Sequence, residues 1–487
     1  MAEHLCWRGF EIPDILEDYL TLWAKECPQK VALICKGDAI TYSQLLERVI
    51  AKEAELKRQG LTEGMAMPIP AVYDPDFLVT YFATHLLGAG AVPLPPHHPS
   101  QLEGICNPNH PSPYHSSSAN HSDSKSNQSP LPWGGEGGGF EGRFYLILFT
   151  TGTTGCSKGV IISREAILAD AENLVEAHQY SHDITFIVNG PLNHLGSLSK
   201  IWPTLMVGGT IHLVETIKDP ADFFLAVDNA HGKVATFLVP ANIRMLLTLS
   251  KKQLAQRADK IDFIETGAAP ISQADMEQLC NILPSTRLYN TYASTETGIV
   301  CTYNYNNGNC LAGCVGKPMK HSSVFITPDG TVACTGKTIM TGYLNHPYSP
   351  HLFNSSILQS FNTSPIIYTH DQGYIDEEGN LHLAGRTDDI INTGGYKVNP
   401  VEVEDAALEC PFVADCVCVP APHPVLGTAI RLIVVTKDNE PLDKRALATF
   451  LASRLDPYKL PQLFTQTDKL KRTFNGKLDR KNYLNEQ

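Results

Sequence analysis

Short apolar runs alternate with amphipathic stretches through the middle of the chain. An apolar run of about four to eight residues between turn residues is typical of a buried strand, and a longer stretch with apolar residues three or four apart is typical of a helix. Their alternation predicts a parallel α/β sheet between residues 144 and 332. Its predicted strands are 184–188, 210–214, 235–239 and 261–266, and its predicted helices are 164–179, 219–230, 241–249 and 272–283.

The N-terminal part continues this pattern. Residues 15–27 are amphipathic with a helical period, residues 31–35 are all apolar, and Thr41 is placed to cap a second helix. We therefore expect two further β/α units ahead of the central sheet.

The pattern becomes that of a small α+β domain after Gly385. We divide the chain into a large N-terminal domain of layered α/β subdomains, residues 1–387, and a small C-terminal domain, residues 388–487. The C-terminal domain has predicted strands near 413–419 and 429–436 and a predicted helix at 443–454.

Residues 97–142 differ from the rest of the chain, because they are rich in Pro, His, Ser, Asn and Gly and nearly devoid of aliphatic side chains. Such a segment cannot bury enough apolar surface to order itself, so we predict a disordered insert. Its five histidines have no metal-ligand spacing, and we assign no metal to them.

Composition limits the classes of function. The chain has 487 residues and a formal net charge of −13, so it is too long for one core and unlike a nucleic-acid-binding protein. Its 13 cysteines include no C-x-x-C pair, which favours reduced thiols in a cytoplasmic protein. The acidic N-terminus is unlike a signal peptide, and no apolar run reaches the length of a membrane span.

The strongest candidate for chemistry is the sequence TTGTTGCSKG at 150–159, which directly follows an apolar run. Glycines let a backbone approach a ligand closely, and hydroxyls, N–H groups and a lysine donate to phosphate oxygens. The spacing differs from a Walker P-loop, because two residues separate Gly155 from Lys158. The candidate phosphate-binding residues are Thr150, Thr151, Gly152, Thr153, Thr154, Gly155 and Lys158.

Further motifs follow this loop in a fixed order. They are GAAP at 267–270, YASTE at 292–296, GCVGKP at 313–318, YTHDQG at 368–373, GRTDDIINTGGYKVNPVEVE at 385–404 and TFNGKLDR at 473–480. Together with the loop they resemble the adenylate-forming superfamily of acyl-CoA synthetases, firefly-type luciferases and peptide-synthetase adenylation domains. The resemblance covers most of the chain.

The resemblance implies an ATP site on the large domain. Thr295 is expected to bind the α-phosphate, Glu296 to hold Mg²⁺, and Asp371 to accept the ribose hydroxyls beside Arg386. Two positions depart from the family, since Ala293 and His370 stand where glycine is usual. The remaining expected nucleotide contacts are Gly267, Ala268, Ala269, Pro270, Tyr292, Ala293 and Ser294.

The resemblance also implies that the C-terminal domain is a mobile lid that hinges at Asp388. Lys477 matches the lysine that bridges the carboxylate substrate and ATP while the adenylate forms. Rotation about the hinge is expected to replace Lys477 by the turn that contains Gly394 and Gly395, close to the incoming thiol.

The implied reaction joins a carboxylic acid to coenzyme A through an acyl-adenylate, with ATP and Mg²⁺. The segment NGPLNHLGS at 189–197 has the form typical of aryl- and acyl-CoA synthetases, with His194 beside the acyl group. An aryl or fatty acid is therefore expected, and the compact length also resembles o-succinylbenzoate-CoA ligases.

Two alternatives stay open at this point. The chain ends seven residues after Arg480, so a pantetheine thiol is expected from free CoA or from a separate carrier protein. A degenerate nucleotide-binding protein without turnover is the other alternative, because the region before the phosphate loop lacks an element that the family usually has.

Overall fold

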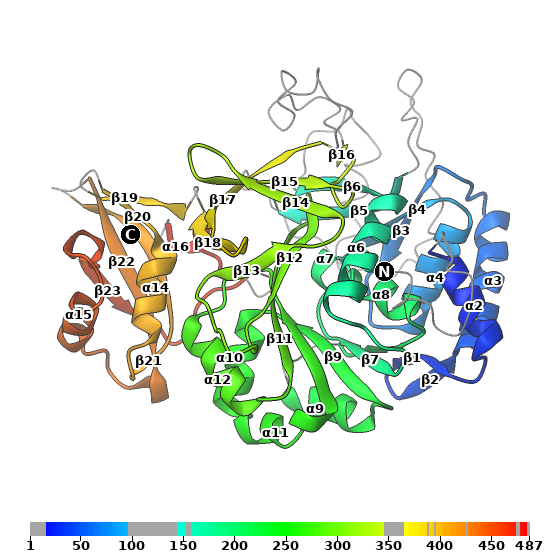
Figure 1. The fold of residues 1–487 in the computed structure, drawn as a ribbon, viewed down its shortest axis with the longest axis horizontal. Coiled ribbons are helices and arrows are strands. Elements are labelled where there is room, and N and C mark those ends of the chain that lie inside the picture. The colour runs from blue at the N-terminus through cyan, green and yellow to red at the C-terminus, as the bar shows by residue number, and fades with distance from the viewer. Residues whose placement is uncertain are drawn as a thin grey trace, which may run out of the picture. The chain divides into compact units, whose positions relative to one another are not determined.

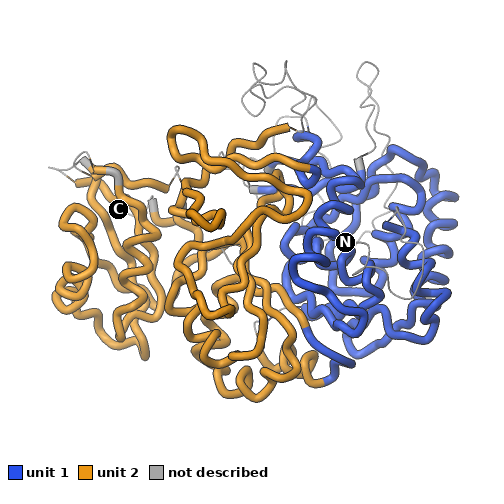
Figure 2. The backbone as a smooth tube through the Cα atoms, in the orientation of Figure 1, with its two compact units in different colours: residues 1–217, 229–234, 337–350 blue, residues 218–228, 235–336, 351–487 orange. Residues whose placement is uncertain are grey.

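The computed structural model describes residues 16–95, 144–151, 157–215, 217, 219–344, 365–386, 389–393, 396–423, 427–473 and 478–484. Its contacts divide the chain into two compact units, which Figure 2 distinguishes by colour. Unit 1 comprises residues 1–217, 229–234 and 337–350, and unit 2 comprises residues 218–228, 235–336 and 351–487. The predicted disordered insert, residues 97–142, lies outside the described residues.

Unit 1 contains two groups of hydrogen-bonded strands with helices packed on them (Figure 1). One sheet has the order β16-β6-β5-β4-β3, and the other strands follow the order β7-β8-β1-β2. The elements are α2 (Asp18–Glu26), β1 (Val31–Cys35), β2 (Asp38–Thr41), α3 (Tyr42–Arg58), β3 (Ala66–Pro70), α4 (Pro75–Leu86), β4 (Gly90–Leu94), β5 (Phe144–Thr151), β6 (Ser157–Ser163), α6 (Arg164–Ala177), β7 (Ile184–Val188), α7 (Leu195–Leu198), α8 (Ile201–Met206), β8 (Thr210–Leu213) and β16 (Gly342–Tyr343).

The N-terminal predictions are confirmed. The predicted strand is β1, and the predicted first helix is α2, although α2 begins three residues later than its amphipathic pattern. Thr41 caps α3, because its hydroxyl accepts a hydrogen bond from the Gln44 amide at 3.3 Å while the Gln44 side chain accepts one from the Thr41 amide at 3.0 Å. This reciprocal pair satisfies two amides that a helix start leaves without partners.

Unit 2 is built on a long mixed sheet with the order β14-β15-β17-β18-β13-β12-β11-β10-β9. Helices α10 and α12 pack together beside it (Figure 1). The elements are α9 (Pro220–Asn229), β9 (Lys233–Leu238), α10 (Pro240–Leu249), α11 (Lys251–Ala255), β10 (Ile261–Thr266), α12 (Gln273–Ile282), β11 (Arg287–Ser294), β12 (Gly298–Asn304), β13 (Cys314–Pro318), β14 (Ser322–Ile326), β15 (Thr331–Gly336), β17 (Ile367–Ile375) and β18 (Leu381–Arg386).

The predicted α/β alternation is confirmed, but the sheet is only partly parallel. Strands β7, β8 and β1 pair in parallel, and so do β10 and β11. From β11 to β18 the neighbouring strands are antiparallel. The prediction of a parallel sheet between residues 144 and 332 was therefore wrong beyond β11, and it was also wrong for β5 and β6, which pair antiparallel. A three-residue turn joins β11 to β12, which is too short for the crossover that parallel neighbours require.

The C-terminal part of unit 2 has its own hydrophobic core. Val403, Cys418, Leu432, Leu447 and Leu451 are buried in it. The two predicted strands and the predicted helix are confirmed as β21, β22 and α15. The elements are β19 (Ile391–Thr393), β20 (Tyr396–Val398), α14 (Pro400–Leu408), β21 (Val413–His423), β22 (Gly427–Thr436), α15 (Lys444–Ala452), β23 (Leu463–Gln466) and α16 (Lys481–Leu484).

In the described part of the chain, no helix is both long enough and apolar enough to span a membrane.

Candidate functional site

The two ends of the predicted phosphate loop lie on the paired antiparallel strands β5 and β6 in unit 1. Thr150 pairs with Lys158 and Thr151 with Ser157 across strands β5 and β6. Both ends of the predicted loop are therefore strand residues, because the pairing continues into the Thr/Gly sequence. Gly152, Thr153, Thr154 and Gly155 lie between them, outside the described residues.

Lys158 has a neighbour that its sequence position did not predict. Its Nζ lies 5.2 Å from the centre of the Tyr343 ring, and Tyr343 belongs to β16, which pairs with β6. A cation over an aromatic face is attracted by the ring, so Tyr343 holds the ammonium group beside the hairpin. A β-carbon at Gly159 would lie 2.9 Å from the Leu344 side chain, so this glycine serves close packing.

The GAAP motif is the turn that follows β10 in unit 2. Ala268 has φ of 67°, a left-handed conformation that is strained for a residue with a β-carbon. A β-carbon at Gly267 would lie 2.9 Å from the carbonyl oxygen of Thr291 on the parallel strand β11. The motif is therefore a tight, partly strained turn that abuts the strand carrying Tyr292.

Replacing Ala268 with glycine is expected to raise the thermal unfolding midpoint by about 1 to 2 °C. Glycine removes left-handed strain of about 1–2 kcal/mol, and its greater freedom in the unfolded chain offsets about half of this gain. The measurement is the unfolding midpoint of the full chain. Ala269→Gly is the matched control in the same turn, without a positive φ, and a lower midpoint is expected for it. Equal effects of both substitutions would contradict the strain.

The YASTE motif lies at the end of β11 and in the turn to β12. Tyr292, Ala293 and Ser294 belong to the strand itself. Thr295 and Glu296 are half-buried in the turn. Strand β11 extends into the motif because Ala293 pairs with Ile299 and Ser294 pairs with Gly298, beyond a bulge that follows Tyr292.

Thr297 stabilises this turn by hydrogen bonds, and its role was not predicted from the sequence. It is completely buried, its amide donates to Ser294 Oγ at 3.0 Å, and its Oγ1 accepts from the Ser294 amide at 3.1 Å. Reciprocal hydroxyl–amide bonds of this kind fix short turns. A serine and a threonine three residues apart at the end of a strand were the available signal.

Asp371 and Arg386 lie directly opposite each other on the antiparallel strands β17 and β18. Arg386 Nη1 donates to Asp371 Oδ1 at 3.4 Å, and Tyr292 Oη donates to Asp371 Oδ2 at 2.6 Å. The structure thus brings together three residues that come from three separate motifs. His370 is exposed on the same strand, and successive side chains of a strand point to opposite faces, so it projects away from the Asp371 carboxylate.

His194 lies in unit 1, where it precedes the short helix α7, and it is half-buried. Its neighbours Asn193 and Ser197 are buried, and a β-carbon at Gly190 would lie 2.4 Å from Ser197 Oγ. The 189–197 segment is therefore tightly packed around Gly190.

The predicted C-terminal residues Asp388, Gly394, Gly395 and Lys477 lie outside the described residues. The structure describes the residues on both sides of the segment that carries Lys477, up to Thr473 and from Leu478. Arg472 and Leu478 form an antiparallel bridge, and the Asp479 amide donates to the Lys471 carbonyl at 3.1 Å.

Arg480 and Glu404 form a buried ion pair near this segment, which the sequence analysis did not assign. Both guanidinium Nη atoms donate to the Glu404 carboxylate, one of them at 2.7 Å, and Nη1 also donates to the Cys418 carbonyl at 2.9 Å. Arg480 Nε lies 3.6 Å from Asp389 Oδ2. Burial alone lowers the pKa of Arg480, but the Glu404 carboxylate outweighs it and holds the pKa above its ordinary value.

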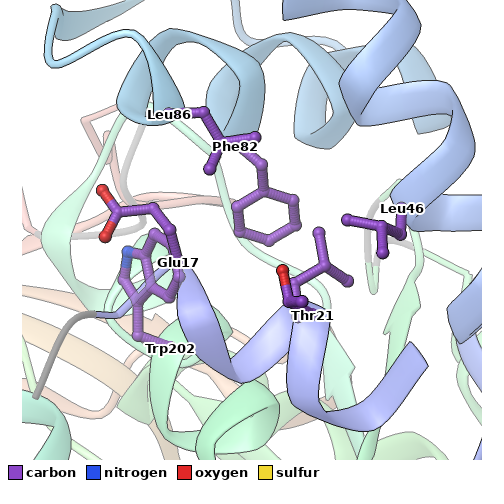
Figure 3. Close-up of a pocket in the computed structure, with 7 residues that line it drawn as sticks. Glu17, Thr21, Leu46, Phe82, Leu86 and Trp202 are labelled. Atoms are coloured by element: carbon purple, nitrogen blue, oxygen red, sulfur yellow. The ribbon is translucent and has the colours of Figure 1, made fainter. Parts of the chain in front are cut away.

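Unit 1 also contains a small cavity (Figure 3). Its volume of about 10 Å³ holds at most one water molecule. Glu17 lines it, and Glu17 Oε1 accepts a hydrogen bond from Tyr145 at 3.0 Å and pairs with Arg164 at 3.2 Å. Burial raises the pKa of Glu17, although these partners oppose the shift. The cavity is too small for a nucleotide, and none of the predicted site residues that the structure describes lines it.

Sequence comparison identifies two regions of one enzyme family. Residues 133–344 match the family described as AMP-binding enzyme, and residues 402–477 match the AMP-binding enzyme C-terminal domain.

Individual relatives include several CoA ligases. The chain is 27% identical to a probable CoA ligase (CCL9) of Humulus lupulus and 28% identical to an indoleacetate–CoA ligase of Aromatoleum aromaticum. These alignments cover 69% and 68% of the chain, and the chain spans 65% of the length of each relative. A third relative, the L-allo-isoleucine:holo-[CmaA peptidyl-carrier protein] ligase of Pseudomonas savastanoi, is 24% identical, with 94% of the chain and 80% of the relative covered.

Solved structures share the fold. ATP-bound MatB from Rhodopseudomonas palustris superposes with a TM-score of 0.77, at 22% identity, covering 95% of this chain and 98% of that one. The o-succinylbenzoate CoA synthetase of Bacillus subtilis, in complex with ATP and magnesium, gives a TM-score of 0.75 at 21% identity, with 95% and 98% covered. The ordered motifs, the two matched regions and the fold agree, and the chain belongs to the AMP-binding, or adenylate-forming, enzymes.

Proposed function

We propose that this protein is an ATP-dependent carboxylic acid–CoA ligase. The carboxylate attacks the α-phosphorus of ATP and releases pyrophosphate, and the thiol of CoA then attacks the acyl carbon of the acyl-adenylate and releases AMP. The observation that supports this most directly is the Asp371 carboxylate, which Tyr292 and Arg386 hold in a member of the AMP-binding family. An aspartate held in this way can accept the hydroxyls of a ribose.

We assign the phosphates to the β5–β6 hairpin and to the turn after β11. Lys158 supplies a cation on strand β6 of the hairpin, and Thr295 offers a hydroxyl in the turn after β11. The adenine is assigned to the GAAP turn and the end of β11. In full, the proposed nucleotide contacts are Thr150, Thr151, Gly152, Thr153, Thr154, Gly155, Lys158, Gly267, Ala268, Ala269, Pro270, Tyr292, Ala293, Ser294, Asp371 and Arg386.

Glu296 fits a magnesium ion as one of several oxygen ligands. It is a half-buried carboxylate in the turn that the hydrogen bonds between Ser294 and Thr297 stabilise. Mg²⁺ is usually bound by one or two carboxylates together with substrate phosphates and water. When bound, the ion neutralises charge that develops on the phosphates.

We assign the first half-reaction to Lys477 and the second to the turn with Gly394 and Gly395, with Asp388 as the hinge between them. Lysine offsets the repulsion between a carboxylate and a triphosphate, and glycines let the backbone approach a pantetheine arm. His194 is proposed to lie beside the acyl group. The proposed acids are aryl or fatty acids, with o-succinylbenzoate as one candidate.

The test is AMP and pyrophosphate formation with MgATP and a panel of acids, with and without CoA. The panel contains benzoates, o-succinylbenzoate, an indole acid and fatty acids of several lengths. AMP formation that rises with CoA for one class of acid is the expected result and names the substrate. A folded protein that binds no ATP and forms no AMP with any acid would refute the proposal.

Transfer of the acyl group to a separate carrier protein is the second candidate. The relative from Pseudomonas savastanoi supports it, because that enzyme acts on a peptidyl-carrier protein and aligns with 94% of this chain. Pyrophosphate release that CoA does not stimulate, followed by acylation of an added carrier protein, would favour this candidate.

A further inference from the structure

The Asp371 carboxylate has two hydrogen-bond donors among the residues that the structure describes. Tyr292 Oη donates to Oδ2 at 2.6 Å, and Arg386 Nη1 donates to Oδ1 at 3.4 Å. The Asp371 side chain is 17% exposed and that of Arg386 is 46% exposed, whereas Tyr292 is buried. The short bond therefore comes from a buried partner and the long bond from an exposed one.

The backbone fixes the position of this carboxylate. Asp371 and Arg386 are register partners on β17 and β18, and the Asp371 amide donates to Thr369 Oγ1 at 3.1 Å. Thr369 Oγ1 in turn donates to the Val332 carbonyl on the neighbouring strand β15 at 2.8 Å. The remaining freedom of Asp371 is rotation of its side chain, and the Tyr292 bond opposes that rotation.

Tyr292 has a role different from that of a direct ligand donor. A phenol carries one proton, and the proton of Tyr292 is used in the bond to Asp371. Burial, and then the Asp371 charge, hold the pKa of Tyr292 far above its ordinary value, so the hydroxyl keeps this proton. Tyr292 is therefore a permanent donor to Asp371 and has no proton to offer to a nucleotide.

The acceptor capacity of Asp371 then matches a ribose. An ionised carboxylate has about four acceptor sites. Tyr292 and Arg386 fill two of them, which leaves two, and a ribose in a nucleotide presents two free hydroxyls. A site whose acceptors are matched to hydroxyls rejects an analogue that lacks one, because an acceptor is then left without a partner.

We propose that Tyr292 is a positioning residue that fixes the Asp371 carboxylate and so sets the selectivity for ATP over 2′-deoxyATP. The inference rests on the proposed function, because it requires that Asp371 binds the ribose of ATP. It goes further by assigning the phenol to the orientation of the carboxylate and by linking that orientation to the choice of sugar.

The test is the binding of ATP, 2′-deoxyATP and 3′-deoxyATP, each without acid or CoA, measured by calorimetry. The parent is expected to bind ATP at least about tenfold more tightly than either deoxynucleotide, since one hydrogen bond to a charged group is lost. In Tyr292→Phe the preference for ATP over 2′-deoxyATP is expected to fall to about twofold, because the carboxylate can rotate and water can occupy the freed site.

Tyr303→Phe is the matched control. Its hydroxyl donates to the Asn309 carbonyl at 2.7 Å and is not bonded to Asp371, so the parental preference is expected. Unfolding midpoints of both variants separate a loss of structure from a loss of selectivity, because a general loosening weakens all three nucleotides alike.

Each outcome decides the inference. A folded Tyr292→Phe that keeps the parental ratio overturns it while leaving the proposed function intact. A parent that binds 2′-deoxyATP as well as ATP overturns it even if the variant does not fold. A folded parent that binds no ATP refutes the proposed function and the inference together.

Discussion

Replacing Glu404 with glutamine is expected to destabilise the C-terminal part of the protein by about 3 kcal/mol. The substitution removes the buried charge that pairs with the largely buried Arg480, and breaking one partner of a buried ion pair typically costs about 3–5 kcal/mol. The side chains of Glu404 and Arg480 are 8% and 18% exposed, so water replaces the lost partner poorly. Glu404 Oε1 also accepts a hydrogen bond from the Cys418 amide at 2.6 Å, and this bond weakens when the acceptor loses its charge.

The measurement is native-state hydrogen exchange, because it reports the stability of β21 separately from that of the rest of the chain. Amides of β21, including that of Cys418, should exchange faster by about two orders of magnitude, which corresponds to about 3 kcal/mol. Glu409→Gln is the matched control. Glu409 pairs with Arg454 at 2.7 Å, but their side chains are 52% and 37% exposed, and an exposed pair contributes at most about 1 kcal/mol. Equal acceleration in both variants would show that the burial of the Glu404 pair has no special effect.

The sequence predicted elements and motifs better than the contacts between them. Strand β1 and the cap at Thr41 follow from local patterns, since an apolar run and a capping hydroxyl act within a few residues. The pair of Glu404 and Arg480 joins residues 76 positions apart, and no local pattern links them. Both residues lay inside recognised motifs, but the partner of each depends on how α14 and the end of the chain pack.

The same division applies to the candidate site. The resemblance indicated Asp371 and Arg386, and the antiparallel pairing of β17 with β18 places them opposite each other. The bond from Tyr292 to Asp371 was not predicted, because it depends on the order of strands between β11 and β17. The left-handed conformation of Ala268 could not be predicted for another reason. Alanine rarely adopts this conformation, and a sequence gives no signal for backbone strain.

The largest effect on activity is expected from Lys477→Ala. If Lys477 offsets the repulsion between the carboxylate and ATP, its loss should slow acyl-adenylate formation by about 100-fold or more, as loss of one electrostatic stabiliser of a transition state typically does. The measurement is acid-dependent exchange of pyrophosphate with ATP, which reports the first half-reaction alone. ATP affinity should change by less than about threefold, because the lysine acts on the reacting groups and the sugar and base contacts remain.

Transfer of the acyl group from a supplied acyl-adenylate to CoA should keep its parental rate in Lys477→Ala, because the two half-reactions are proposed to use different parts of the C-terminal domain. Lys471→Ala removes the same charge from a nearby lysine, whose Nζ lies 5.7 Å from the centre of the Tyr483 ring, and parental exchange is expected for it. A similar loss in both lysine variants would indicate a general effect of net charge. Loss of both half-reactions in Lys477→Ala alone would contradict the assignment of this lysine to adenylate formation.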